Sequence, residues 1–203
     1  YGNANQIVID LANRVMPVVK EAPMIAGICG TDPTREMRPF LKHLIELGFS
    51  AVMNFPTVGL IDGRFRQELE DTGMGYGKEI EALKLGSELG LFTLGYAFNV
   101  EEAAMVGEAK LDVLICHMGL TRGGSIGSKY AEGMSLEDAA ALIRDMTKAA
   151  REKNPDILIF AHGGPIAMPE DTAYIYKNTE AVGFLGASSI ERIPVEKPLM
   201  EAV

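Results

Sequence analysis

The chain has 203 residues, of which 47% are hydrophobic and 23% are charged, and these values are close to those of globular domains. Its longest apolar runs are well short of the roughly 18 residues that span a bilayer, so we expect no membrane partner. The net charge of −9, from 19 Lys and Arg against 28 Asp and Glu, repels polyanions and argues against a nucleic-acid partner. Two isolated cysteines, Cys29 and Cys116, fit buried thiols in a reducing compartment, and we expect a cytoplasmic protein.

Six apolar, strand-like runs each precede a helix-like segment. A helix over residues 3–15, capped by Asn3 or Asn5, comes before the first strand, residues 25–30. Asp32 and Pro33 then predict the cap and first turn of a helix that ends at Gly48. The second strand, residues 51–56, is followed by a long connection over 57–77 and a helix over 78–89. Connections of that length are usually functional or mobile.

The remaining four units repeat the same order of strand and helix. They are, by residue number, 91–98 with 100–109, 113–119 with 136–153, 157–164 with 170–178, and 183–189 with a helix from about 195. Ser135 predicts a cap for the helix over 136–153. This alternation predicts one α/β domain over 1–203, built on a parallel sheet. A closed (β/α)₈ barrel has eight strands, so we expect a missing amino-terminal segment or another domain to supply the first two.

Ligands of such sheets gather at the carboxyl ends of the strands, where this chain places polar side chains. His117 and His162 occupy equivalent strand ends, although the chain has only three histidines. An imidazole there can act as general acid or base, bind a metal ion or orient a substrate oxygen. The alternative for each is a buried histidine that only bonds to a neighbouring carbonyl.

The last two strand ends are rich in small residues and resemble the phosphate-binding arrangement of (β/α)₈ barrels. The anion-binding residues that we predict are Asn54, Thr121, Gly163, Gly164, Gly186, Ala187, Ser188, Ser189 and Arg192. The alternative is that the glycines form tight turns and that the polar residues brace loops.

Two carboxylates are candidates for Mg²⁺ ligands or for a catalytic base. Asp32 follows the first strand and Glu191 follows the last. Asp32 is equally an N-cap, and Glu191 is equally the partner of Arg192 in a local ion pair.

Several strand-end motifs together resemble one family of barrel proteins. They are Gly27-Ile-Cys-Gly-Thr-Asp-Pro33, Asn54-Phe-Pro-Thr-Val-Gly-Leu-Ile-Asp-Gly63, Glu70-Asp-Thr-Gly-Met-Gly-Tyr76, His117-Met-Gly-Leu-Thr121, His162-Gly-Gly-Pro-Ile166 and Gly186-Ala-Ser-Ser-Ile-Glu-Arg192. The set resembles the phosphoenolpyruvate hydrolase-like family, a resemblance that covers almost the whole chain. It implies a TIM (β/α)₈ barrel of the phosphoenolpyruvate/pyruvate superfamily, of which this chain holds strands three to eight. The same domain occurs in the carboxyl half of plant proteins that inhibit viral replication.

The convergence of these residues on one face of the sheet, together with the resemblance, predicts an enzyme that acts on a small phosphorylated or pyruvate-like carboxylate as a hydrolase or a C–C or C–P lyase. His117, His162, Glu191 and Asp32 are then the expected catalytic residues. A non-catalytic barrel that senses a metabolite or serves as a scaffold is the alternative. A metal-dependent aldolase or lyase, using Mg²⁺ or Mn²⁺, is a third. We also expect a homo-oligomer.

Overall fold

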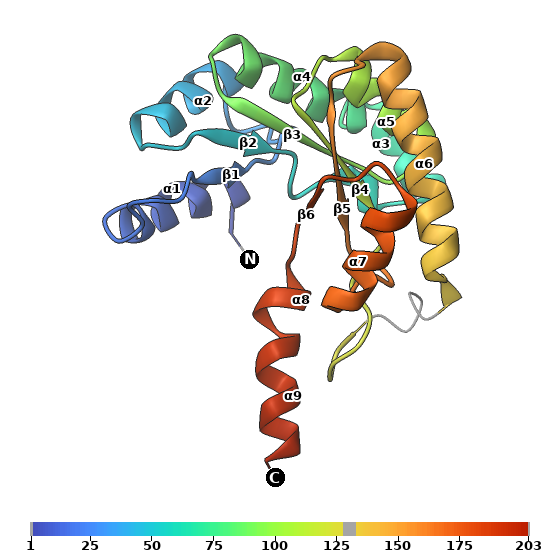
Figure 1. The fold of residues 1–203 in the computed structure, drawn as a ribbon. Helices are drawn as coiled ribbons and strands as arrows, with labels where there is room; N and C mark the ends of the chain where they lie inside the picture. The colour runs from blue at the N-terminus through green and yellow to red at the C-terminus, as the bar shows by residue number, and fades with distance from the viewer. Residues whose placement is uncertain (1, 128–132, 203) are drawn as a thin grey trace. The chain divides into compact units, whose positions relative to one another are not determined.

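The computed structural model describes residues 2–127 and 133–202. The chain forms two compact units, one of Tyr1–Tyr96 with Glu108–Val113 and the other of Ala97–Gly107 with Leu114–Val203. Strands alternate with helices along both units (Figure 1). We therefore describe the two units in turn.

The first unit contains the parallel strands β1 (Ile25–Gly27), β2 (Ala51–Met53) and β3 (Phe92–Ala97), which begins here. Ile25 is in register with Ala51, and Ala51 with Phe92. The helices of this unit are α1 (Ala4–Val15), α2 (Met37–Glu46), the 3₁₀ turn η1 (Val58–Leu60), α3 (Gly63–Asp71) and α4 (Tyr76–Glu88). The order of the strands in the sheet is the order in the chain.

The second unit contains β4 (Val113–His117), β5 (Leu158–His162) and β6 (Gly183–Phe184), again adjacent in chain order. Phe160 is in register with Gly183, and the pair is parallel. The helices are α5 (Val100–Glu108), most of which belongs here, α6 (Leu136–Lys153), α7 (Pro169–Asn178), α8 (Ser188–Glu191) and α9 (Ile193–Glu201). Six parallel strands in sequential order, alternating with helices, are the topology of part of a (β/α)₈ barrel.

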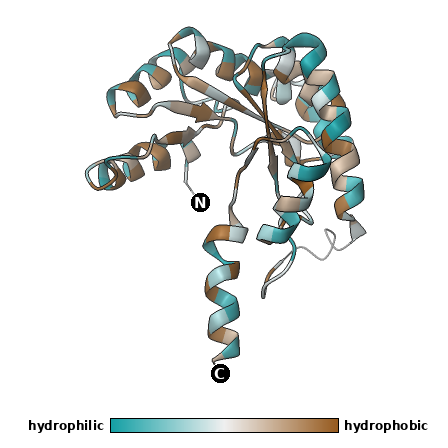
Figure 2. Ribbon diagram, in the orientation of Figure 1, coloured by the Kyte–Doolittle hydropathy of each residue, from teal (hydrophilic) through white to brown (hydrophobic). Residues whose placement is uncertain are grey.

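The burial of the strands follows their hydropathy. Every residue of β4 is buried, and β3 is buried from Thr93 onward, as expected for strands covered on both faces. Figure 2 shows the strands mainly in brown, whereas α6 carries both colours because one of its faces meets solvent. Within residues 2–127 and 133–202, no helix is both long and apolar enough to cross a membrane.

The helix caps confirm two predictions and correct a third. Asn3 caps α1 by accepting from Gln6 N–H, and Ser135 forms a capping box with Asp138 at the start of α6. The prediction that Asp32 and Pro33 begin the next helix is wrong, since α2 begins at Met37. The Asp32 carboxylate instead accepts from Thr34 N–H at 2.9 Å and closes a turn.

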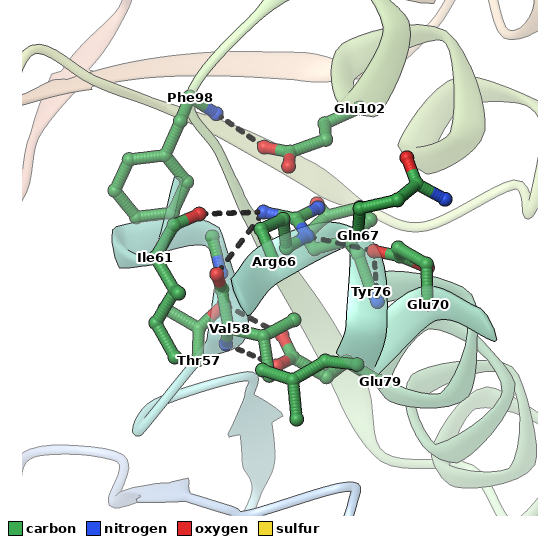
Figure 3. A network of polar contacts seen from close by, with 12 residues as sticks. Thr57, Val58, Ile61, Arg66, Gln67, Glu70, Tyr76, Glu79, Phe98 and Glu102 are labelled. Atoms are coloured by element: carbon green, nitrogen blue, oxygen red, sulfur yellow. Dashed lines mark hydrogen bonds and ion pairs between the residues drawn. The ribbon is translucent and has the colours of Figure 1, made fainter. Parts of the chain in front are cut away.

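The predicted connection over 57–77 is also corrected, because it contains η1 and α3. Arg66 on α3 holds it together by donating to the Val58 carbonyl at 3.0 Å and to Glu70 at 2.7 Å (Figure 3). Glu70 in turn accepts from Tyr76 N–H at the start of α4, 3.0 Å away. The segment is therefore an ordered element with its own polar bonds.

Candidate functional site

Two histidine rings meet in the second unit, at the ends of its first two strands. His117 is the last residue of β4 and His162 is the last residue of β5. Their ring centroids are 4.4 Å apart in an edge-on arrangement, and the side chains are 3% and 7% exposed. The Phe98 ring lies 4.4 Å from that of His117. The two histidines therefore occupy equivalent strand ends, as predicted, and their rings are in contact.

The tautomer of His117 follows from its hydrogen bond to the backbone. The Gly119 N–H donates to Nδ1 of His117 at 3.0 Å. Because an amide can only donate, Nδ1 must hold a lone pair, and a neutral ring then carries its proton on Nε2. His117 therefore has Nε2–H as its donor.

His162 is fixed in the opposite tautomer. Its Nδ1 lies 2.5 Å from the carbonyl oxygen of Leu185, in the segment after β6. Because a carbonyl can only accept, Nδ1 carries the proton, and Nε2 of the neutral ring has the lone pair. The two rings thus differ at Nε2, one a donor and one an acceptor.

Both rings are held neutral by their surroundings. Burial, together with the proximity of His162, lowers the pKa of His117 from 6.5 to about 3. Burial also lowers the pKa of His162, while its hydrogen bond to Leu185 opposes that shift. The carbonyl partner makes His162 the better suited of the two to accept a proton.

The glycines beside the histidines join the two strand ends. Gly164 N–H donates to the Gly119 carbonyl at 2.8 Å, and Arg122 N–H donates to the Gly164 carbonyl at 3.0 Å. A Cβ on Gly163 would lie 2.2 Å from the Gly119 oxygen, and one on Gly164 would lie 2.3 Å from the Met118 oxygen. Both glycines also have positive φ, of 73° and 57°. The turn that we gave as the alternative for these glycines is present, and the Gly164 amide is used within it.

The other predicted residues of this unit lie in the loop after β4 and around α8. Thr121 is buried, whereas Gly186, Ala187, Ser188 and Ser189 are partly exposed. The hydroxyl oxygen of Ser189 is enclosed, and within the described part of the chain no group hydrogen-bonds to it. Glu191 is exposed at the end of α8.

Arg192 forms a clasp with Glu196, the pair being 2.8 Å apart, in place of the predicted pair with Glu191. Arg192 also donates to the Gly123 carbonyl at 3.0 Å. Glu196 accepts from the N–H and the hydroxyl of Ser125, at 2.7 and 2.8 Å. The clasp therefore fastens the loop after β4 to α9 and occupies the guanidinium that we predicted as an anion ligand.

Asp32 lies in the first unit, buried beside the start of α1. Its Oδ1 accepts from Thr34, and its Oδ2 accepts from Asn3 at 2.8 Å and from Asn5 at 3.0 Å. Burial would raise the pKa of Asp32, but these hydrogen bonds outweigh it and lower the pKa from 3.8 to about 2. Such a carboxylate is a weak base, so the geometry favours a bracing role.

Asn54, predicted to bind an anion, is fully buried in the first unit, where its side chain bonds to the backbone of β3. Its Oδ1 accepts from Tyr96 N–H at 2.7 Å, and its Nδ2 donates to the Tyr96 carbonyl at 3.3 Å and to Glu79 at 2.8 Å. Glu79, which is 1% exposed, also accepts from Thr57 and from Val58 N–H, both at 2.7 Å (Figure 3).

Sequence reasoning missed the roles of Glu79 and Asn5. Glu79 falls on the apolar stripe of α4 with Leu83 and Gly86, and a carboxylate in such a stripe is a usable signal. Asn5 accepts from Cys29 N–H at 2.8 Å and donates to the Cys29 carbonyl at 3.1 Å. Its contacts cross more than twenty residues and leave no local pattern.

Metal-binding side chains do not converge in the part of the chain that the structure describes. Among residues 2–127 and 133–202, no three His, Cys, Asp or Glu side chains are grouped to hold an ion. The prediction of Mg²⁺ at Asp32 or Glu191 therefore stays a prediction.

The family of this chain follows from a comparison with known protein families. The family model described as "Phosphoenolpyruvate hydrolase-like" matches residues 1–203. The chain belongs to the phosphoenolpyruvate hydrolase-like family. The resemblance of its strand-end motifs to that family is thereby confirmed.

Proteins similar in sequence to this chain come from a plant and a bacterium. The tomato proteins "ToMV susceptible protein tm-1(GCR26)" and "ToMV resistance protein Tm-1(GCR237)" are each 50% identical over 204 residues, which is all of this chain but only 27% of their own length. The "Putative transcriptional regulatory protein y4pA" of Sinorhizobium fredii is 32% identical over 95% of this chain and 31% of its own length. This phosphoenolpyruvate hydrolase-like chain thus corresponds to about a quarter to a third of these longer proteins.

Solved structures support the fold of the family member. A "putative deoxyribose-phosphate aldolase from Coccidioides immitis" matches with a TM-score of 0.56 at 15% identity, over 93% of this chain and 70% of its own. A mutant of FabK from Thermotoga maritima matches with a TM-score of 0.53 at 19% identity, over 87% of this chain and 48% of its own. These neighbours are TIM-barrel proteins, so the partial (β/α)₈ barrel is confirmed.

Proposed function

We propose that this chain carries an acid–base site for a small phosphorylated or pyruvate-like carboxylate, of the hydrolase or C–C/C–P lyase type. The observation that carries the proposal is the contact between His117 and His162, whose rings are fixed in opposite tautomers at two adjacent strand ends. In barrels of this kind the chemistry takes place at that edge of the sheet. The name of the family supports a substrate of this class.

The two rings divide the work according to their tautomers. Nε2 of His162 accepts the proton, and Nε2–H of His117 donates a hydrogen bond to the oxygen that gains negative charge. In the hydrolysis of phosphoenolpyruvate, a water oxygen bonds to phosphorus while the bridging P–O bond breaks. The proton of that water passes to His162, and His162 then returns it to the carbon of the enolate that leaves, which gives pyruvate and restores the neutral ring. A neutral His117 stabilises the enolate oxygen without being protonated itself.

The anion of the substrate is assigned to residues whose backbone or hydroxyl groups remain suited to it. These are Thr121 and Gly163 beside the histidines, and the segment from Gly186 to Ser189 after β6. The Gly164 amide, Arg192 and Asn54 are already engaged in the bonds described above. Glu191, exposed on α8, remains a candidate base or Mg²⁺ ligand, to be tested by chelation and by Glu191→Gln.

The test is the turnover of phosphoenolpyruvate and of other phosphorylated or keto acids by His117→Gln and His162→Gln. Release of phosphate and release of pyruvate are followed separately, so that hydrolysis and C–C cleavage are distinguished. We expect each variant to lose roughly two to four orders of magnitude in kcat. His43→Gln, on the exposed face of α2, is the matched control. Unchanged turnover in folded variants of both site histidines would overturn the proposal.

A regulatory barrel is the second candidate, favoured by the names of the relatives, one called a resistance protein and one a transcriptional regulatory protein. In that case the same strand-end residues bind a metabolite without converting it. Thermal stabilisation by a keto acid or phosphorylated acid, with no product over long incubation, would favour this function. The predicted homo-oligomer is checked in the same preparation by sedimentation.

A further inference from the structure

A small pocket opens in the second unit. Some of its residues are close in sequence to His117 and His162, but the histidines do not line it. Its volume is about 260 Å³. The loop after β4, the start of α7 and one face of α9 surround it. The lining residues are Arg122, Gly123, Gly124, Ala167, Met168, Asp171, Ile193 and Lys197.

The charges around this pocket are unequal. Arg122 and Lys197 are cationic, and Asp171 is the one acidic residue among those that line it. The Asp171 carboxylate is occupied by the backbone, since its Oδ2 accepts from Ala167 N–H at 3.0 Å and from Met168 N–H at 2.9 Å. Its negative charge therefore lies against the positive end of α7, which offsets it.

Both cations have weak partners. Arg122 forms an ion pair with Asp171 at 3.6 Å, a distance too long for a hydrogen bond. The Lys197 ammonium is 3.7 Å from the Met168 sulfur, a weak acceptor and its only hydrogen-bonding neighbour within residues 2–127 and 133–202. Two basic side chains thus line one pocket, and their N–H groups can donate hydrogen bonds to a ligand.

The rest of the wall is apolar and anchored. Ile193 and Ala167 are buried and contribute hydrocarbon to the lining. A site lined by two cations and by apolar side chains fits a short organic acid better than a bare inorganic ion.

The pocket is joined to the histidine pair through the backbone. Arg122 N–H donates to the carbonyl of Gly164, two residues after His162. A Cβ on the neighbouring Gly163 would lie 3.7 Å from Cε1 of His117. The loop that presents Arg122 is therefore pinned to the turn that touches the imidazole rings.

We propose that Arg122 and Lys197 form a second site, apart from the residues assigned above to the reacting anion, which binds the anionic group of a small organic acid and determines specificity for that group. The inference rests on the proposed function for the identity of the acid, a carboxylate or phosphorylated acid with a short carbon chain. The ammonium supplies an adaptable point charge, and the guanidinium supplies paired N–H donors that match a carboxylate or phosphate.

Calorimetric titration of the protein with pyruvate, phosphoenolpyruvate and inorganic phosphate tests this site. We expect Lys197→Gln and Arg122→Gln each to weaken the binding of the two organic acids roughly tenfold or more. Arg122→Lys should restore part of the loss caused by Arg122→Gln. Lys177→Gln, which removes the same charge from an exposed position of α7, is the matched control and should bind as the parent does.

The outcomes separate this site from the acid–base proposal. Weaker binding in both pocket variants, with normal binding but lost turnover in His162→Gln, supports both. Unchanged affinity in Lys197→Gln and Arg122→Gln overturns the pocket and leaves the histidines to be judged by turnover. Failure of the parent protein to bind either organic acid also overturns the pocket. Weaker binding in the pocket variants with full turnover in His162→Gln supports the pocket and overturns the acid–base role.

Discussion

The side chain of Asn54 bonds to both backbone groups of Tyr96, as a peptide unit of a neighbouring strand would. The side chain of Asn5 likewise bonds to both backbone groups of Cys29. Each amide nitrogen also donates to a buried carboxylate, that of Glu79 or that of Asp32. The same hydrogen-bonding arrangement thus occurs twice in the first unit. In each case an asparagine links the end of a strand to a buried carboxylate.

Replacement of Asn54 by Asp should destabilise the protein severely. The change keeps the size of the side chain but turns the donating nitrogen into an oxygen that faces the Tyr96 carbonyl and the Glu79 carboxylate. We expect a loss of about 3 kcal/mol or more in the free energy of unfolding, measured by chemical denaturation. Asn13→Asp, exposed on α1, should cost well under 1 kcal/mol. Similar losses in the two variants would contradict the peptide-like role of Asn54.

Gly163→Ala and Gly119→Ala separate steric from conformational cost. Both glycines have positive φ, so a side chain at either costs roughly 1–2 kcal/mol. Only at Gly163 would the new methyl group collide with a backbone oxygen, whereas nothing lies within 4 Å at Gly119. Equilibrium unfolding should therefore show an additional loss of about 1–3 kcal/mol for Gly163→Ala. Equal losses would mean that the two strand ends are not packed as described.

The buried His117 should make stability fall in mild acid. Its folded pKa of about 3 lies below the unfolded value of 6.5, so the unfolded chain takes up a proton first as pH falls. The free energy of unfolding should then decrease by about 1.4 kcal/mol per pH unit from this residue between pH 6.5 and 3. The decrease should be smaller in His117→Gln, where the lowered pKa of His162 still contributes, and intact in His43→Gln. An unchanged slope in His117→Gln would show that the ring is protonated as easily in the folded protein.

The clasp of Arg192 and Glu196 should control the order of the loop that it holds. Glu196→Gln removes the charge that accepts from the Ser125 backbone, so we expect the Ser125 amide to exchange with deuterium several-fold faster. The hydrogen bond from that amide lowers the pKa of Glu196, so protonation of Glu196 in acid should reduce the protection of the Ser125 amide, measured against its intrinsic exchange rate at the same pH. Glu201→Gln, at the end of the same helix, is the control and should leave the exchange unchanged.

The repeated alternation of apolar strands and helices was enough to predict the barrel and most of its elements. Ser135 and the 136–153 helix were located to the residue because a capping box and an amphipathic stripe are local signals. Helix α3 escaped prediction because none of its residues is buried, so it has no apolar stripe. Asp32 was assigned to the wrong cap because its partners Asn3 and Asn5 come from a helix almost thirty residues earlier.

In the candidate site, too, local signals were predictable from the sequence and contacts between distant residues were not. The equivalent positions of His117 and His162 are readable from two matching strand ends, but their tautomers depend on Gly119 and Leu185, which only the folded backbone brings near. The pattern of residues at the last two strand ends predicted Gly164 and Arg192 as anion ligands. In the structure, tertiary hydrogen bonds occupy the Gly164 amide and the Arg192 guanidinium. The residues that we now place in the anionic pocket, Arg122 and Lys197, lie 75 positions apart and share no motif.

The two asparagine linkers have a consequence for the lifetime of the protein. Spontaneous deamidation requires the next backbone nitrogen to attack the side-chain carbonyl, which an amide pinned at both ends cannot readily allow. If the reaction did occur at Asn5 or Asn54, it would set a new negative charge against Asp32 or Glu79. The hydrogen bonds that complete the strand ends therefore also protect Asn5 and Asn54 from deamidation.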